Sequence, residues 1–436
     1  MVLVIGLDLG RKSRHQAVVL DDMQQHVFSR KVASSTGDLQ RLLTAARKHS
    51  RGGEIHVVME ATGMAWLVPT EFFRDAGCRV YRVKADKAAD FRRYLSKHTK
   101  TDQVDAVSLA RMRFVEPDAL EEVHLRDQER FVLKQLIKQR EDFLADAVRY
   151  KNRLKDLLDS FIPGLSGLSN RLVEKRKFRP VLEKLLNLPW VQTMGRKRFH
   201  RYVGRRDADL KEGDIDRIYD VCMDALALHD EAYVDFDVLQ GQAVNYAEAV
   251  AFAEAKVDEL TEKIEAAYRV TDADQILKSI PGVGKLTAAY AEAYLAPIER
   301  FPDEKSVDSW AGVIPRTSAS GQVQRKGLRM SKAGPPALRR VLYLAADVAR
   351  RDDPQLAAVY HREMVDKGNP HTKAVVACMR RLLHRIVRVM RDRRLYELRD
   401  LDGDPLDKHT ARQMISTELQ VPPEVRRRLT QRREAS

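Results

Sequence analysis

Four acidic residues in the first third of the chain have the spacing of a metal site. Asp8 lies in the apolar segment GLDLG, and Glu60 ends a second apolar run, HVVMEATG. A carboxylate inside an apolar strand is costly unless it is paired or binds a cation. Asp102 and Asp105 follow in KTDQVDA, which reads as a helix start, and their spacing puts both on one face. All four carboxylates could converge if that helix packs across a sheet.

Oxygen ligands of this kind suit Mg²⁺, or Mn²⁺, rather than zinc. Two such ions about 4 Å apart could stabilise both oxygens of a phosphoryl displacement. Plainer alternatives exist for each residue: Asp102 as a helix N-cap, Asp105 as a surface acid, Asp8 as a turn residue. The spacing therefore predicts a metal site but does not exclude these roles.

A polar segment punctuated by glycines, residues 310–340, holds candidate nucleophiles: Ser318, Ser320 and Ser331. Five cations are close to them in sequence: Arg316, Arg325, Lys326, Arg329 and Lys332. A serine beside several cations could attack a phosphodiester, because the cations would stabilise the developing charge. A solvated loop serine is the commoner case, and the residue types do not choose among the three.

The segment IPGVGKLTA, residues 280–288, has the pattern of a helix-hairpin-helix turn. Gly282 and Gly284 would allow a tight turn with exposed backbone N–H groups, and Lys285 adds charge. Such N–H groups at a helix start can hold a phosphate without reading sequence. A plain turn between two helices is the alternative.

The first 125 residues alternate short apolar runs with helical patterns. Strands are predicted at residues 3–9, 16–21, 26–34, 54–61 and 78–83, and helices at 38–49, near 65–76 and after the fifth strand. Three consecutive strands suit antiparallel hairpins, whereas later strands that alternate with helices suit a parallel sheet. We therefore predict an α/β domain with a mixed five-stranded sheet and helices on both faces, which is the ribonuclease-H-like plan.

From about residue 126 the patterns are all-α. Long helical patterns at 140–161 and 229–270 flank a basic, then mixed, helical insert at 170–228. The long helices suggest a coiled-coil arm, and a plain helical bundle is the alternative. The expected division is a sheet domain at 1–125, an arm with its insert at 126–272, a helical serine domain at 273–360, and a basic helical C-terminal region and tail at 361–436.

Bulk properties narrow the class of protein. The chain has 436 residues, 44% of them hydrophobic, which is too many for one ordinary domain. A formal net charge of +14 favours nucleic acid as a partner over a merely solvated basic surface. No apolar run is long enough to span a membrane, and the apolar N-terminus is expected to be a core strand rather than a signal peptide. Widely spaced Cys78, Cys222 and Cys378 predict neither disulfides nor a zinc site and fit a reducing cytoplasm.

Taken together, these motifs resemble a known family. GLDLG, MEATG and KTDQVDA look like the DEDD signature of certain insertion-sequence transposases, and SIPGVGKLTA, AGVIPRTSASG and LRMSKAGPPALRR are similar to their C-terminal transposase domain. That family comprises bridge-RNA-guided DNA recombinases and includes pilin-gene inverting enzymes. The resemblance covers about 1–160 and 275–350, and the segment between them, about 160–275, is long for the family.

The resemblance implies a RuvC-like (Holliday-junction-resolvase-like) domain, a coiled coil and a helical serine domain. The four acids would bind Mg²⁺, and the family serine that precedes a glycine falls on Ser320. This serine would attack DNA and form a covalent phosphoserine intermediate. The serine and the acids would come from different subunits of a homodimer or homotetramer, and a noncoding guide RNA would select target and donor DNA.

Two alternatives remain at this point. The first is a metal-dependent junction endonuclease in which water attacks and Ser320 is a bystander. The second is a nucleic-acid-binding protein without catalysis, which the presence of all four acids disfavours.

Overall fold

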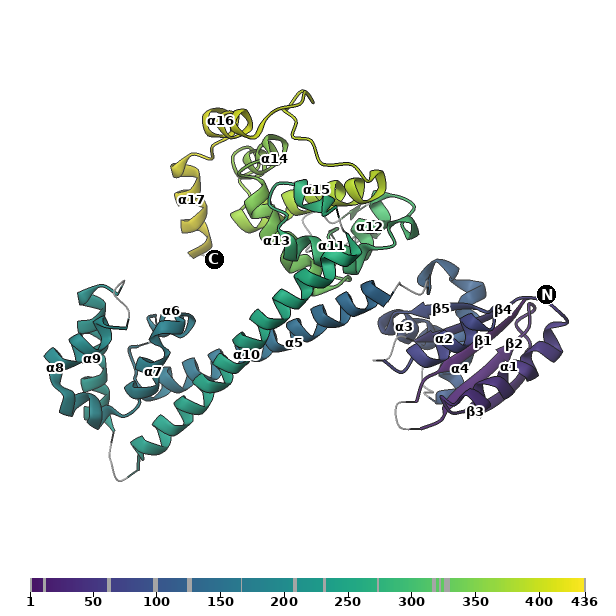
Figure 1. The fold of residues 1–436 in the computed structure, drawn as a ribbon, viewed down its shortest axis with the longest axis horizontal. Coiled ribbons are helices and arrows are strands. Elements are labelled where there is room, and N and C mark those ends of the chain that lie inside the picture. Colours follow the sequence, from purple (N-terminus) through teal and green to yellow (C-terminus); the bar gives the residue numbers. More distant parts are fainter. Residues whose placement is uncertain are drawn as a thin grey trace. The chain divides into compact units, whose positions relative to one another are not determined.

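The computed structural model describes residues 2–10, 13–60, 64–96, 101–123, 128–165, 167–206, 210–229, 233–272, 274–315, 319–320, 323–324 and 330–434. The chain divides into two compact units, Met1–Leu125 and Arg126–Ser436. The first unit is built on a sheet, and the second is almost entirely helical (Figure 1). Among the described residues no helix is long and apolar enough to cross a membrane.

The first unit contains a mixed six-stranded sheet in the order β3-β2-β1-β4-β5-β6. Its strands are β1 (Leu3–Asp8), β2 (His15–Leu20), β3 (His26–Val32), β4 (Ile55–Glu60), β5 (Arg79–Val83) and β6 (Leu120–Glu122). β1, β2 and β3 pair antiparallel as consecutive hairpins, whereas β4 joins β1 and β5 joins β4 in parallel. The predicted mixed sheet is confirmed. The prediction of five strands was wrong, because β6 has only three residues and lacks a strand-like apolar pattern.

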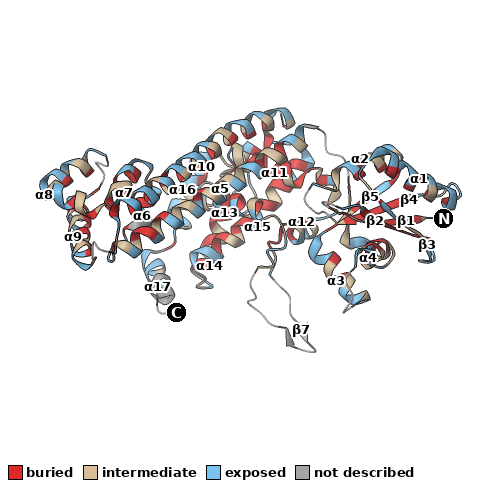
Figure 2. Cartoon of the chain, turned by 90° about the horizontal axis from the view of Figure 1, so that it is seen from below, coloured by how far each residue is buried: buried red, intermediate tan, exposed pale blue. Residues whose placement is uncertain are grey.

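Helices cover both faces of this sheet. They are α1 (Thr36–Ser50), α2 (Leu67–Asp75), α3 (Ala85–Leu95) and α4 (Asp102–Val115). Alternate residues of β1 point to opposite faces, as a pleated strand requires. Ile5 packs in one core with residues of α1 and α2, and Val4 packs in the other with residues of α3 and α4. The central strands are accordingly buried along their length (Figure 2).

Two long helices organise the second unit. α5 (Gln128–Phe161) and α10 (Phe236–Thr271) pack against each other along much of their length (Figure 1). They run antiparallel, because the start of α5 and the end of α10 enter one core while the opposite ends enter another. The structure therefore contains the two long helices expected on either side of the insert.

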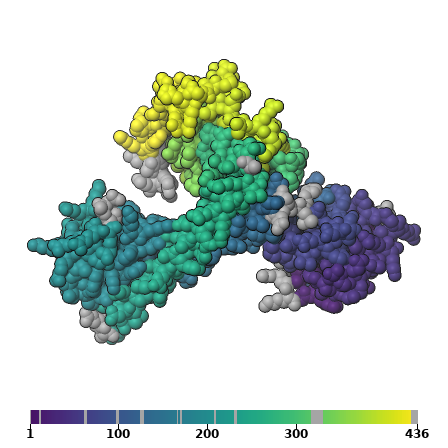
Figure 3. Space-filling view, viewed as in Figure 1, coloured from purple at the N-terminus to yellow at the C-terminus, as the bar shows by residue number. Residues whose placement is uncertain are grey.

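The insert forms a helical body of its own at one end of this pair (Figure 3). Its helices are α6 (Ser169–Glu174), α7 (Arg179–Leu185), α8 (Leu188–Gly204) and α9 (Glu212–Leu228). Their apolar faces enclose fully buried side chains such as Phe178 and Phe199, together with residues from the adjoining ends of α5 and α10.

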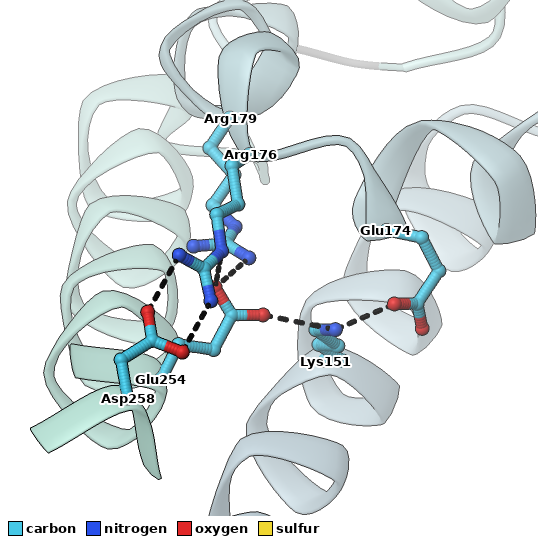
Figure 4. A network of polar contacts seen from close by, with 6 residues as sticks. All are labelled: Lys151, Glu174, Arg176, Arg179, Glu254 and Asp258. Atoms are coloured by element: carbon cyan, nitrogen blue, oxygen red, sulfur yellow. Dashed lines mark hydrogen bonds and ion pairs between the residues drawn. The ribbon is translucent and has the colours of Figure 1, made fainter. Parts of the chain in front are cut away.

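A polar network fixes the insert to both long helices (Figure 4). Lys151 of α5 binds Glu174 of α6 at 2.5 Å and Glu254 of α10 at 3.0 Å. Glu254 also accepts a hydrogen bond of 2.6 Å from Arg179 of α7, a guanidinium that is almost completely buried. Burial alone would raise the pKa of Glu254, but the hydrogen bonds from Arg179 and Lys151 lower it.

The rest of the second unit is a helical domain built around the other ends of α5 and α10. Its helices are α11 (Lys285–Leu295), α12 (Glu304–Ala311), α13 (Pro336–Ala349), α14 (Pro354–Met364), α15 (His371–Asp392), α16 (Lys408–Glu418) and α17 (Pro423–Glu434). α15 lies in the C-terminal region that was predicted to be basic and helical; its apolar face is buried and its arginines lie on the opposite face. A two-stranded ribbon, β7 (Ala319–Ser320) with β8 (Val323–Gln324), follows α12.

Candidate active site

Asp8 and Glu60 end two neighbouring parallel strands. β1 and β4 pair with Leu7 beside Met59, so the next residue of each strand is an acid. The carboxyl ends of parallel strands meet at the same edge of a sheet, which is where α/β proteins bind their ligands. Both side chains are partly exposed. The fold thus places these two predicted ligands at one edge.

Helix α4 crosses β1 at a point where the strand has no side chain. A Cβ on Gly6 would lie 1.9 Å from the carbonyl oxygen of Ala106 and 2.7 Å from the amide nitrogen of Ala110. Both are backbone atoms of α4, so only glycine allows this approach. The glycine of the GLDLG motif therefore brings α4, with Asp102 and Asp105 in its first turn, directly onto the sheet.

Glu60 and Asp105 line one pocket of about 150 Å³, together with Arg92 and Ser108. Arg92 of α3 places its Nε 3.0 Å from Oδ1 of Asp105. Both side chains are largely buried, with 18% and 23% of their surface exposed. The positive charge of Arg92 therefore balances Asp105 beside Glu60.

Asp102 is the first residue of α4 and is exposed. The N-cap of this helix is Thr101, whose side chain accepts a hydrogen bond of 3.2 Å from the backbone N–H of Val104. The alternative role of Asp102 as N-cap is therefore wrong, because its neighbour already fills that position. Asp102 and Asp105 lie one turn apart on the same side of the helix.

The donor chemistry fits Mg²⁺, because carboxylate oxygens are the ligands this ion prefers. Glu60 and Asp105 share a pocket, and Asp8 ends the strand next to Glu60. Among the described residues, no three acidic, histidine or cysteine side chains are gathered closely enough to hold a metal. A metal ion in this pocket would compete with Arg92 for the carboxylate of Asp105.

The candidate serines fall between α12 and α13, in a segment of which the structure describes residues 312–315, 319–320, 323–324 and 330–334; we call these described parts the ribbon. At its base, the backbone N–H of Ser331 donates to the carbonyl of Ile314 at 2.8 Å, and that of Lys332 donates to the carbonyl of Gly312 at 3.1 Å. Gly312 ends α12 with φ 68°, a left-handed conformation that favours glycine. The ribbon is thus closed by antiparallel backbone bonds at its base.

Side chains of the helical domain fix this base. Arg339 of α13 donates hydrogen bonds to the carbonyls of Gly334 and Ala311, and burial lowers its pKa. Asp308 of α12 is fully buried and binds Arg380 at 2.6 Å and His384 at 2.9 Å. Burial alone would raise the pKa of Asp308, but the hydrogen bonds from these two α15 residues lower it.

Ser320 is the last residue of β7 and pairs with Val323 of β8, so two residues separate the strands. The position of the Ser320 side chain lies outside what the structure describes. Ser318 and four of the candidate cations are also outside the described residues: Arg316, Arg325, Lys326 and Arg329.

Ser331 is described and is a poor candidate for nucleophile. Its Oγ is buried and has no hydrogen-bond partner among the described residues. An enclosed hydroxyl is not accessible to a DNA phosphate. Its neighbour Lys332 is exposed, with φ 57°.

One glycine of the predicted phosphate-binding turn packs closely against α13, and the other does not. A Cβ on Gly282 would lie 2.4 Å from the carbonyl oxygen of Ala345, so this glycine permits contact with α13. Gly284 is the N-cap of α11 and has open space beside it. Lys285 places its Nζ 2.9 Å from Glu265 of α10. The element before the turn is a 3₁₀ helix of four residues, Ile276–Ser279.

Sequence reasoning missed Arg92, Arg339 and Asp308. Arg92 and Arg339 belong to ordinary helical patterns, and Asp308 lies in a short polar helix. The types and spacing of these residues do not indicate a role in the site, because their partners are distant in sequence. Only their contacts in the folded chain identify them.

Two family models match the chain. One, described as Transposase and built on the DEDD transposases of IS110, matches residues 5–163. The other, described as Transposase IS116/IS110/IS902 family, matches residues 274–361. The first match contains the four acids, and the second contains the glycine turn and the serine ribbon.

Full-length relatives extend this likeness across the insert. The chain is 24% identical over 397 residues to the insertion element IS110 uncharacterized 43.6 kDa protein of Streptomyces coelicolor, an alignment covering 91% of this chain and 95% of that protein. It is 25% identical over 403 residues to the insertion element IS116 uncharacterized 44.8 kDa protein of Streptomyces clavuligerus, covering 90% and 95%. Because so little of this chain is left out, most of the segment between the two family matches is aligned as well.

A shorter match is to a protein whose name states its role. The chain is 27% identical over 124 residues to the pilin gene-inverting protein of Moraxella lacunata, covering 28% of this chain and 38% of that protein.

Proposed function

The chain belongs to the IS116/IS110/IS902 family of transposases, enzymes that cleave and transfer DNA strands, and we propose that it acts through a serine nucleophile assisted by a magnesium site. The nucleophile is Ser320. The ligands of the ion are the four carboxylates Asp8, Glu60, Asp102 and Asp105. The observation that supports the proposal is the pocket lined by Glu60 and Asp105, together with the close approach of α4 to β1 at Gly6.

In the proposed reaction, Oγ of Ser320 attacks the phosphorus of the scissile phosphodiester. An Oγ–P bond forms, the bond from phosphorus to the leaving strand breaks, and the serine proton goes to the leaving oxygen. The phosphoserine retains the free energy of the cleaved phosphodiester bond. A hydroxyl of the partner strand then attacks the phosphorus, a new phosphodiester bond forms, the Oγ–P bond breaks, and the hydroxyl proton passes to Oγ of Ser320. Mg²⁺, when bound, supplies Lewis-acid stabilisation of charge on the phosphate oxygens. Lys332, which is exposed at the base of the ribbon, adds positive charge to the same segment of the chain.

The proposal extends to fold and partners. The order of strands in the sheet supports a ribonuclease-H-like, RuvC-like domain at 1–125. We further propose that α5 and α10 act as a coiled-coil arm within 126–272, that the turn at Gly282 is a helix-hairpin-helix in a serine domain at 273–360, and that 361–436 is a basic C-terminal region. A homodimer or homotetramer would combine the acids of one subunit with the serine of another. A noncoding RNA would guide the enzyme to target and donor DNA in the cytoplasm.

The test is strand exchange in cells that carry the gene with its native flanking DNA. We expect Ser320→Ala to abolish recombinant junctions, because the variant lacks the proposed nucleophile. Ser331→Ala is the matched control and should keep junction formation near wild type, because its hydroxyl is enclosed. Full activity of Ser320→Ala, with Asp105→Asn inactive, would instead identify a metal-dependent endonuclease. Asp118→Asn, an exposed acid of the same unit, controls for loss of charge alone.

A further inference from the structure

The second half of α8 in the insert carries an unusual concentration of positive charge. Residues 196–206 contain six lysines and arginines and no acid. Gly195, with φ 70° and ψ 156°, interrupts α8 just before them, so this segment is in effect a separate short helix. Neither the glycine turn nor the serine ribbon includes it.

The packing of this helix turns the cations outward. Phe199 and Val203, four residues apart, are fully buried in the core of the insert. Lys197 precedes Phe199 by two residues, and Arg201 precedes Val203 by two. This spacing places both cations on the opposite face of the helix, where they are exposed. Arg205, one turn further on, is exposed as well. These three cations form a line that we call the α8 stripe: Lys197, Arg201 and Arg205.

Acids of the neighbouring helix do not neutralise the stripe. Asp216 and Asp220 of α9 bind Arg196, on the flank of α8, and Asp216 also binds His200 at 2.9 Å. Within the described parts of the chain, none of the three stripe residues forms an ion pair. The positive field of the stripe is therefore directed to solvent.

We propose that the α8 stripe binds the phosphate backbone of duplex DNA. The apolar face of α8 is buried in the core of the insert. The helix therefore has no exposed apolar face with which to bind a lipid surface. From Lys197 to Arg205 the stripe spans about 12 Å at 1.5 Å per residue, a length of duplex axis that carries about seven phosphate charges. This inference rests on the proposed function in one respect, which is that DNA rather than RNA is the molecule held there.

A stripe of this kind would position DNA without reading its sequence. Lysine and arginine contacts to phosphates fix the register of a protein on the duplex but carry no base information. The network of Lys151, Arg179 and Glu254 fixes the insert to α5 and α10, so the stripe has a rigid support (Figure 4). The insert would thereby hold DNA that flanks the site of cleavage.

The test measures binding of the full-length protein to a labelled 40-base-pair DNA duplex by fluorescence anisotropy over a range of KCl concentrations. Each lost phosphate contact lowers the slope of log K against log salt by about 0.9. We expect Lys197→Ala/Arg201→Ala to lower the magnitude of that slope by roughly 1.8 and to weaken binding about tenfold at low salt. Lys211→Ala/Arg217→Ala removes two exposed cations, one at the N-cap of α9 and one within this helix, and should leave slope and affinity near wild type.

Three results would overturn the inference: wild-type slope and affinity in the stripe variant, an equal loss in the α9 control, or a loss confined to a duplex RNA of the same sequence. Lys197→Arg/Arg201→Lys retains both charges and should restore the slope, which separates charge from damage to the fold. Ser320→Ala should bind as wild type does. Failure of the serine mechanism would therefore appear in strand exchange and not in this assay.

Discussion

At the scale of single residues, the acid site is held by a charge that the sequence does not reveal. Arg92 lies against Asp105 in the pocket that also contains Glu60. Two carboxylates facing one pocket repel each other unless a cation lies between or beside them. In the protein without a metal ion, the guanidinium of Arg92 is that cation. A divalent ion would compete with Arg92 for the carboxylate of Asp105.

Replacing Arg92 by alanine should therefore strengthen metal binding. We expect Mn²⁺ affinity, measured by titration calorimetry or electron paramagnetic resonance, to rise about three- to tenfold, because Asp105 no longer has a competing partner (roughly 1 kcal/mol). Arg93→Ala is the matched control, since Arg93 pairs with Asp90 on the exposed side of the same helix. Unchanged or weaker Mn²⁺ binding in Arg92→Ala would contradict the competition.

At the scale of elements, the site depends on how closely a helix can approach a strand. α4 lies on β1 because Gly6 has no Cβ, and Ala106 and Ala110 keep the facing surface of the helix small. The four acids sit on three elements that would otherwise be held further apart by side chains. The same principle applies to the ribbon, where Gly312 and Gly334 let its two ends meet.

A methyl group at Gly6 should disturb this contact. The added Cβ would meet backbone atoms that cannot rotate away, so Gly6→Ala is expected to destabilise the protein by about 2 kcal/mol and to shift α4. Denaturant unfolding measures the first effect, and loss of Mn²⁺ binding reports the second. Gly37→Ala, in α1 of the same unit, meets only the tip of Arg41 at 3.6 Å and should be tolerated. Equal stability of the two variants would show that the close approach is not required.

The network that supports the insert gives a second prediction at this scale. Glu254→Ala leaves the buried Arg179 without its carboxylate and should cost about 3 kcal/mol in unfolding free energy. Glu259 lies on the same helix between two lysines but is exposed, so Glu259→Ala should have little effect. Thermal unfolding of both variants at neutral pH tests the contrast.

The pH dependence of this contribution has a definite sign. The pKa of Glu254 is lowered in the folded protein from its ordinary value of 4.5, with the bonds from Arg179 and Lys151 outweighing burial. Its contribution is therefore complete above pH 4.5 and is lost as the pH falls through the lower, folded value. The stability difference between wild type and Glu254→Ala should shrink on acidification below that point. A difference that grows on acidification would contradict the assignment.

At the scale of the whole molecule, the chain has several separate hydrophobic cores rather than one continuous core. The sheet unit has a core on each face, the insert has its own, and the C-terminal helices enclose another. α5 and α10 contribute to both helical cores, with different ends. Separate cores of this kind allow parts of a chain to unfold at different temperatures.

Thermal unfolding of the full chain should accordingly show more than one transition. We expect scanning calorimetry to resolve at least two, with Gly6→Ala lowering one and Glu254→Ala lowering another. Circular dichroism provides the check, because unfolding of the sheet unit removes strand as well as helix, whereas the described part of the insert loses helix alone. One transition that both variants lower together would show that the cores unfold cooperatively.

The sequence by itself determined the composition of the site and the order of its parts. Acids at the ends of apolar runs, the i, i+3 pair of Asp102 and Asp105, and the glycines that punctuate 310–340 are local patterns, and local patterns follow from neighbouring residues alone. The mixed sheet and the two long helices were predictable for the same reason. Motif order also identified the family, because a resemblance is read from residue identities.

Only the tertiary structure decided which groups meet. Arg92 reaches Asp105 from another helix, Lys285 is directed to Glu265, and Ser331 is enclosed while Ser320 lies on a strand of the ribbon. The exposure of the α8 stripe likewise follows from the burial of Phe199 and Val203 against distant helices. Contacts between residues far apart in the chain depend on how elements pack, and packing is set by the combined shape of many side chains rather than by any one segment.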